Sequence, residues 1–132
     1  EAYLTALNIQ HGVWIKLKGD ILPDATVFRV NLGTDDLNIG LHFNPRFDYL
    51  GDVNIIVFNS RKDGKWGGEH RERNFPFVPG TTVEIQMMLE EQQFRVRMHD
   101  GSDCAFPNHL DLRKIDFISV YGDFSVRRVE FE

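Results

Sequence analysis

Short segments in which apolar and polar residues alternate recur along this chain, and turn-forming residues separate them. Val13, Ile15 and Leu17, for example, alternate with bulky or charged neighbours, and Gly19 follows them. Because successive side chains of a strand point to opposite faces of a sheet, a period of two is typical of half-buried strands. No window of eleven or more residues carries a convincing helical period. The pattern therefore predicts an all-β protein, either a sandwich or a barrel.

Three local features refine this outline. Pro45 has no N–H to donate, so it should end the third strand. The segment 54–60 is apolar on both faces, which predicts a central strand, and the alternation slips near Arg127 and Arg128, which predicts a β-bulge. We expect strands over residues 13–18, 28–32, 37–44, 54–60, 69–75, 83–89, 94–98, 117–121 and 124–131.

The size of the chain fits one domain. Its 132 residues and 15.3 kDa lie near the commonest domain size, and 42% of the residues are hydrophobic. Aromatic residues make up 12% of the chain, which is enough to fill a core. We therefore expect residues 1–132 to form a single domain that needs neither a disulfide nor a metal ion to stay folded.

Charge and hydropathy argue against two kinds of partner. The net charge is −5, whereas binding to phosphate backbones needs a clear cationic excess on some face, so we expect no nucleic-acid partner. No apolar run approaches the roughly 20 residues that span a bilayer, so we expect no membrane insertion.

The N-terminus and the cysteine content bear on the compartment. Residues 1–4 lack the charged-then-apolar layout of a signal peptide, and Cys104 is the single cysteine, without a partner for an internal disulfide. Both features fit synthesis in a reducing compartment. We expect a cytoplasmic protein that reaches the outside of the cell by a route independent of a signal peptide.

Polar residues gather on one face of the third predicted strand and just beyond it. His42 and Asn44 share the face opposite to Leu41 and Phe43, and Arg46 follows two residues later. A lone histidine on a strand is usually structural, but three hydrogen-bonding side chains in phase point to a ligand.

The next segments add further candidates. Asn59 closes the segment 54–60, Trp66 stands among glycines, and Glu69 and Arg71 lie two residues apart on one face. A sugar hydroxyl both donates and accepts, so fixed donors and acceptors of these kinds suit it, and an indole offers a flat apolar surface to a sugar ring. A phosphate site would favour glycine-rich backbone amides without a carboxylate. The set is therefore typical of a site for a neutral polyol.

The same residues carry a family resemblance. His42-Phe43-Asn44-Pro45-Arg46, Val57-Phe58-Asn59 and Trp66-Gly67-Gly68-Glu69-His70-Arg71, with their spacing, resemble the galectin signature. Segments 75–80, 106–108 and 122–124 are also similar to galectin landmarks, so the resemblance covers essentially the whole chain. It implies a two-sheet antiparallel jelly-roll sandwich with one carbohydrate-recognition domain, the layout of the prototype galectins.

The resemblance also implies a function: metal-independent and cofactor-free binding of β-galactosides of the lactose and N-acetyllactosamine type. Asp52 would be a peripheral member of that site. Leu50 stands where many prototype galectins have a histidine, which would change contacts near the galactose 2-hydroxyl. Carried over position by position, the resemblance assigns the axial 4-hydroxyl of galactose to His42, Asn44 and Arg46. It assigns the 6-hydroxyl to Asn59 and Glu69, and the C–H face of the ring to Trp66. The second sugar would contact Glu69, Arg71 and Arg46.

Prototype galectins pair through their terminal strands, so the resemblance implies a homodimer that cross-links glycans of glycoproteins or glycolipids. Tyr3, Leu4 and Leu7 lie near one end of the chain, and Val129 and Phe131 near the other. Apolar residues at chain ends fray unless something covers them, and an exposed strand edge is a template for pairing. The alternative is that these side chains pack only on the core of their own domain.

Two other functions stay open. A glycoside hydrolase needs two carboxylates about 5–9 Å apart, and Glu69 with Asp52 would be that pair. Two arginines beside Glu69 would keep it ionised, which suits binding more than acid catalysis, so we expect no enzyme. The other alternative is a structural, lens-type relative with incidental sugar binding.

Overall fold

The computed structural model describes residues 1–132 and contains strands but no helix, so no helix is present that could cross a membrane. Every pairing between strands is antiparallel, and the all-β prediction is confirmed. The strands are β1 (Ala2–Leu4), β2 (Ile9–Gln10), β3 (Trp14–Ile21), β4 (Phe28–Asp35), β5 (Asn38–Tyr49), β6 (Asp52–Lys62), β7 (Lys65–Trp66), β8 (His70–Glu72), β9 (Thr82–Leu89), β10 (Gln93–Arg97), β11 (Asp103–Pro107), β12 (Lys114–Ile115), β13 (Phe117–Gly122) and β14 (Phe124–Phe131).

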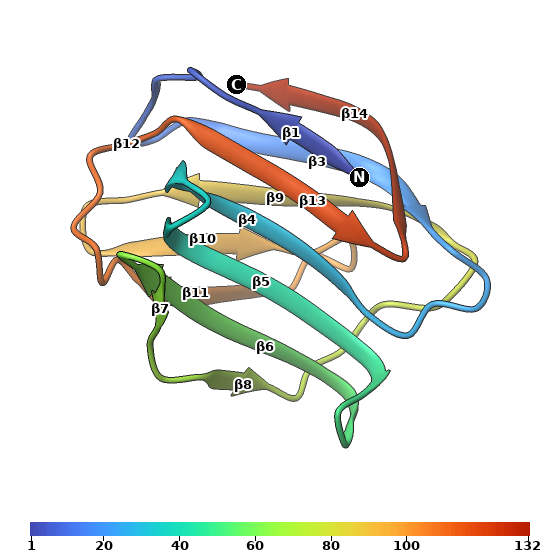
Figure 1. Cartoon of the computed structure of the whole chain (residues 1–132). Coiled ribbons are helices and arrows are strands. Elements are labelled where there is room, and N and C mark those ends of the chain that lie inside the picture. The colour runs from blue at the N-terminus through green and yellow to red at the C-terminus, as the bar shows by residue number, and fades with distance from the viewer.

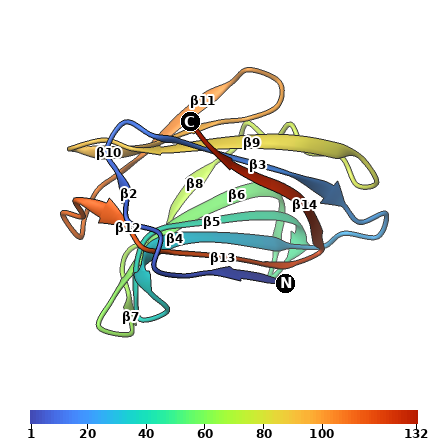
Figure 2. The same ribbon diagram turned by 90° about the horizontal axis from the view of Figure 1, so that it is seen from above.

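Two sheets face each other, as the view from above in Figure 2 shows. The larger sheet has the order β1-β13-β4-β5-β6-β7, and β8 also pairs with β6. The smaller sheet has the order β11-β10-β9-β3-β14, and β2 and β12 form a separate short ladder. Figure 1 shows both chain ends on the same side of the sandwich, where β1 and β14 are the edge strands of the two sheets. The two-sheet antiparallel sandwich is the expected fold.

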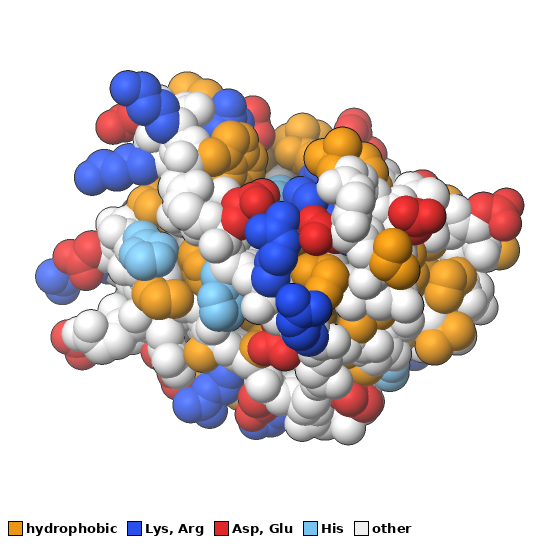
Figure 3. Space-filling model, turned by 90° about the horizontal axis from the view of Figure 1, so that it is seen from below, with side chains coloured by type: hydrophobic (Ala, Val, Ile, Leu, Met, Phe, Trp, Pro, Cys, Tyr) orange, Lys and Arg blue, Asp and Glu red, His pale blue; other side chains and the backbone are white.

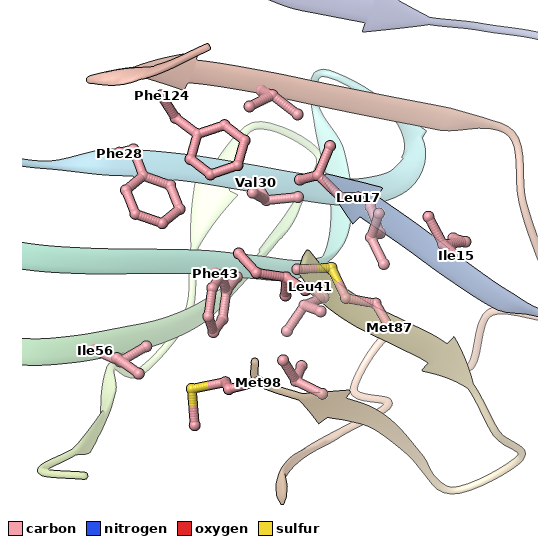
Figure 4. Packing of buried hydrophobic residues seen from close by; sticks show 14 of the residues in the cluster. Ile15, Leu17, Phe28, Val30, Leu41, Phe43, Ile56, Met87, Met98 and Phe124 are labelled. Atoms are coloured by element: carbon pink, nitrogen blue, oxygen red, sulfur yellow. The ribbon is translucent and has the colours of Figure 1, made fainter. Parts of the chain in front are cut away.

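The core lies between the two sheets and contains 26 buried residues. Every second residue of β3 is buried, which is the pattern that an alternating sequence produces when one face of a strand meets a core. Leu41 and Phe43 of β5 point into this core, which Ile15 and Leu17 of β3 enter from the other sheet (Figure 4). The intervening side chains of β5 consequently lie on the outer face of the larger sheet.

The prediction that Pro45 ends the third strand is wrong. β5 continues to Tyr49, and Pro45 lies in register opposite Ile56 of β6. The strand therefore carries Arg46 in the same regular geometry as His42.

A side-chain hydrogen bond explains how the strand tolerates this proline. The register that pairs Val30 with Phe43 places Pro45 opposite Phe28, where a regular ladder would need the N–H that proline lacks. The backbone oxygen of Phe28 instead accepts a hydrogen bond from Asn44 Nδ2 at 2.9 Å. The amide of Asn44 thus supplies the donor that its neighbour cannot.

The other strand predictions have mixed outcomes. β6 has neighbours on both sides, and the register of β14 shifts between Val126 and Arg128, so the central strand and the bulge are confirmed. The charged strand is shorter than predicted, because β8 covers only His70–Glu72. Strands β1, β2, β7, β11 and β12 were not predicted.

Two tight hairpins place the polar motifs side by side. Leu50-Gly51 joins β5 to β6, and Asp63-Gly64 joins β6 to β7, with positive φ at all four residues. Two-residue turns of this kind match the twist of the strands that they connect. For Leu50 the left-handed conformation costs about 1 kcal/mol, since it has a Cβ. The hairpins fix β5, β6 and β7 as consecutive neighbours.

Candidate functional site

A pocket of about 480 Å³ lies on the outer face of the larger sheet, across strands β13, β4, β5, β6 and β7. Sheet register brings its members together, because His42 of β5 pairs with Asn59 of β6 on one side and with Asn31 of β4 on the other. Six of the residues predicted from the sequence line this pocket: His42, Asn44, Arg46, Asn59, Trp66 and Glu69.

His42 is held as a neutral imidazole. Its Nδ1 lies 2.6 Å from Asn31 Oδ1, and its ring centre lies 4.6 Å from that of Trp66. Burial, together with the positive charges of Arg29 and Arg46, lowers the pKa of His42 from 6.5 to about 4. Above pH 5, His42 therefore offers one donor and one acceptor nitrogen.

The guanidinium of Arg46 is fixed from several sides. Nε donates to Asn44 Oδ1 at 3.0 Å, Nη1 donates to Asp52 Oδ2 at 2.8 Å, and Nη2 lies 3.9 Å from Glu69 Oε2. The ring of Tyr49 lies 5.3 Å from the guanidinium carbon. Only 11% of the Arg46 side chain is exposed. These contacts leave Nη2 as the less engaged donor group of an oriented cation.

Asp52 is more central than the sequence predicts. Its carboxylate accepts hydrogen bonds from Arg46 and, at 3.0 and 3.3 Å, from Nη2 and Nε of Arg71. The hydrogen bond from Arg71 is the main reason that the pKa of Asp52 lies below its usual range. Asp52 does not line the pocket but ties together two arginines that approach it.

Arg71 is likewise not among the residues that line the pocket, and 40% of its side chain is exposed. Its Nη1 lies 3.0 Å from Glu69 Oε1, so the predicted pair forms. Arg46, Asp52, Arg71 and Glu69 make one network of alternating charges, in which each cation meets a carboxylate. Figure 3 shows acidic and basic side chains interleaved in a compact strip on the lower side of the molecule, without an extended basic patch there.

Trp66 presents an indole at the pocket rim, where the residue is 47% exposed. The guanidinium of Arg61, its register partner on β6, lies 5.3 Å from the indole ring. Across the strand pair, Asn59 Oδ1 accepts a hydrogen bond from the backbone N–H of Ser60 at 2.8 Å. Asn59 Nδ2 makes no hydrogen bond within the chain, so this group is left for a ligand.

Sequence reasoning missed several residues of the pocket. Arg29 and Asn31 line it from β4, Tyr49 from β5 and Tyr121 from β13. Arg29 Nη2 donates to the hydroxyl of Tyr49 at 3.1 Å. The alternation of residues 28–32 does place residues 29 and 31 on the face away from the core, and that was the available signal. Only the pairing of β4 with β5 shows that this face is the one that carries His42.

Other reactive groups do not join the site. Nowhere in the chain do three or more His, Cys, Asp or Glu side chains form a group that could hold a metal ion. Burial raises the pKa of the Cys104 thiol to about 12, so this cysteine is a poor nucleophile. The pocket therefore offers hydrogen-bond donors and acceptors beside one apolar platform, which suits a ligand rich in hydroxyl groups.

Comparisons with known proteins agree on one family. A family model described as galactoside-binding lectin matches residues 3–131. Galectin-1 of Sus scrofa is 44% identical over 126 residues, which cover 96% of this chain and 93% of that protein.

Solved structures agree as well. CG-16, described as a homodimeric agglutinin from chicken liver, is 44% identical with a TM-score of 0.97, and the match covers 99% of this chain and 98% of that one. A toad ovary galectin in complex with N-acetylgalactose is 37% identical with a TM-score of 0.96, and the match covers 100% and 98% of the two chains.

Proposed function

The chain belongs to the galactoside-binding lectin family, the galectins, and on that premise we propose that it binds β-galactosides in the pocket on the outer face of its larger sheet. The observation that carries this proposal is the convergence of six signature residues, from three consecutive strands and the loop that follows, on one pocket. The ligands are glycans of the lactose and N-acetyllactosamine type, on glycoproteins or glycolipids. Neither metal nor cofactor takes part.

The side chains at the centre of the pocket recognise the axial 4-hydroxyl of galactose. Arg46 donates a hydrogen bond to its oxygen, Asn44 adjoins it, and His42 accepts a hydrogen bond from its O–H. A charged donor makes such a hydrogen bond stronger than a neutral one. In glucose the 4-hydroxyl is equatorial, so it would leave these groups unpaired, which costs about 1–3 kcal/mol for each buried group.

The flanking residues hold the rest of the disaccharide. Trp66 stacks on the C–H face of galactose, and Asn59 and Glu69 bind its 6-hydroxyl. Glu69 and Arg71, with Arg46, reach the second sugar. Asp52 contributes indirectly, because it orients the two arginines before the ligand arrives.

Binding without catalysis is part of the proposal. The family is one of lectins. A glycosidase would need a carboxylic acid that keeps its proton, whereas the pKa of Asp52 lies below its usual range beside Arg71 and Arg46. The alternative of a lens-type packing protein gives no reason for a preorganised cluster of charges around a pocket.

Titration with lactose tests this function. We expect a saturable change in tryptophan fluorescence, because the ligand covers Trp66, and no change with sucrose. The chain has a second tryptophan, Trp14, which lies on β3 of the other sheet. The variant Trp14→Phe should therefore keep the response. A flat titration with lactose would remove the lectin function.

The proposal includes a homodimer joined through the terminal strands. β1 and β14 are the edge strands of the two sheets, and Tyr3 and Phe131 are 53% and 44% exposed on them. Leu4, Leu7 and Val129 are partly buried against the core of their own domain. Packing on the domain's own core thus applies to the partly buried residues, whereas Tyr3 and Phe131 are exposed and can contact the second copy.

Sedimentation at micromolar concentration should show a species of about twice the 15.3 kDa chain mass. Charge substitution of both Tyr3 and Phe131 should give monomers that still bind lactose but no longer agglutinate cells, since cross-linking needs two sites. The matched control is the same pair of changes at Val53 and Val78, which are also exposed but lie elsewhere. A wild-type monomer would contradict the dimer, and a dimer that survives the first pair would move the interface.

The proposal extends to where the protein is made and acts. A cytoplasmic origin, with release by a route independent of a signal peptide, suits a chain whose one cysteine is free and whose thiol pKa is raised to about 12 by burial.

A further inference from the structure

Asn31 is a residue of the pocket to which the function proposed above gives no role. It lies on β4, opposite His42 in the sheet register, and is 1% exposed. Its Oδ1 is 2.6 Å from His42 Nδ1, and its Nδ2 is 3.0 Å from Ser119 Oγ and 3.4 Å from the hydroxyl of Tyr121. Both hydroxyls belong to β13, the strand on the far side of β4 from His42.

The orientation of the amide pairs all of its polar atoms. The two N–H groups of Nδ2 face the hydroxyls of Ser119 and Tyr121, which can both accept, and the amide oxygen faces the imidazole. A carbonyl oxygen can only accept, and 2.6 Å is short even for an N–H···O hydrogen bond. His42 Nδ1 must therefore carry the proton of this contact.

We propose that Asn31 is a positioning residue that holds His42 in the tautomer protonated on Nδ1, so that Nε2 faces the ligand as a hydrogen-bond acceptor. The inference rests on the proposed galactoside binding by His42. A hydroxyl that accepts from Arg46 must donate its own proton elsewhere, and Nε2 has no partner within the chain that would compete for it. In the other tautomer, His42 and Arg46 would both be donors, and His42 could not accept the hydrogen bond of the hydroxyl.

The charges that face His42 agree with a neutral ring. Arg29 from β4 and Arg46 from its own strand are both cations and disfavour protonation. Asn59 from β6, Trp66 from β7 and, through Asn31, Tyr121 from β13 carry no charge, and Glu69 lies on the same pocket without a contact to the ring. Asp36 and Glu69 also line the pocket, but the charges that act on the pKa of His42 are the two arginines.

Nitrogen NMR of the free wild-type protein at pH 7 tests the tautomer directly. We expect the Nδ1 signal of His42 at the position of a protonated ring nitrogen and the Nε2 signal at that of an unprotonated one. The opposite assignment, or an averaged pair of signals, would overturn the proposal. Because no sugar is present, this result stands whether or not the protein binds lactose.

A pH profile of lactose affinity tests the role of the amide. In Asn31→Asp, a carboxylate replaces the amide oxygen at the same position and should raise the pKa of His42. The affinity of the variant should then fall about tenfold for each pH unit below that raised pKa and recover above it.

The control variant is Gln92→Glu, an amide-to-carboxylate change on an exposed turn beside the other sheet. The lactose affinities of this control and of the wild type should change by no more than about twofold between pH 5.5 and 7.5, because the pKa of His42 is about 4 in both proteins. A folded Asn31→Asp protein whose profile matches the wild type would contradict the role of Asn31. Failure of all three proteins to bind lactose would instead contradict the proposed function and leave the NMR result to decide the tautomer.

Discussion

Arg46→Ala is expected to abolish measurable binding of lactose. The change removes a charged donor to the sugar and also the partner of Asn44 Oδ1 and of Asp52 Oδ2. A hydrogen bond to a charged group contributes about 1.5–3 kcal/mol. Loss of two such bonds to the ligand, one to the 4-hydroxyl and one to the second sugar, lowers the affinity at least about a hundredfold. Isothermal titration calorimetry, with thermal unfolding measured in parallel, checks this result.

Two variants sharpen the test. Arg46→Lys keeps the charge but not the planar fork that contacts Asn44 and Asp52 together, so its affinity should also fall well below that of the wild type. Arg95→Ala removes an arginine paired with Glu90 on the smaller sheet and should bind lactose normally. If Arg46→Ala folds and keeps its affinity within a few-fold, the 4-hydroxyl is read by other groups.

Trp66→Ala in the wild-type protein should cost most of the affinity for lactose and leave the fold intact. Stacking of a ring on an aromatic side chain contributes about 1–3 kcal/mol, which corresponds to a loss of roughly 5- to 150-fold. Stability should change little, because Trp66 is 47% exposed on a two-residue strand at the edge of the sheet. Calorimetry and circular dichroism together separate the two effects.

Trp66→Phe keeps a flat ring and should retain part of the affinity, whereas Trp14→Phe on the other sheet should retain all of it. An unfolded Trp66→Ala protein would mean that the indole is a core residue. Normal binding by that variant would place the apolar platform for the sugar elsewhere.

The charge network explains why these two changes should have the largest effects. Arg46 and Arg71 share Asp52, and Glu69 adjoins both, so both guanidiniums are oriented before a ligand arrives. A preorganised site loses less side-chain entropy on binding. Trp66 is the only tryptophan of the pocket and supplies its broad apolar surface.

The sequence alone determined the local features of this protein, which are most of the strands and the face of the sheet to which each side chain points. A period of two assigns each side chain to a face, so Leu41 and Phe43 were correctly expected inside and His42 and Asn44 outside. The slip at residues 127–128 revealed the bulge of β14. Six of the signature residues, in consecutive segments joined by short turns, were expected together and do line one pocket.

The tertiary structure alone decided which strands are neighbours and in which register. Asn31 contacts His42, eleven residues away in the sequence, and Ser119, 88 residues away, and no local pattern encodes either contact. Asp52 likewise becomes the link between Arg46 and Arg71 only when β5, β6 and β8 lie side by side. Even Pro45 stays within its strand because Asn44 reaches across to Phe28 on β4. The alternation of a strand fixes its faces, whereas register depends on packing the whole sandwich, because a slip of one residue would turn every core side chain outward.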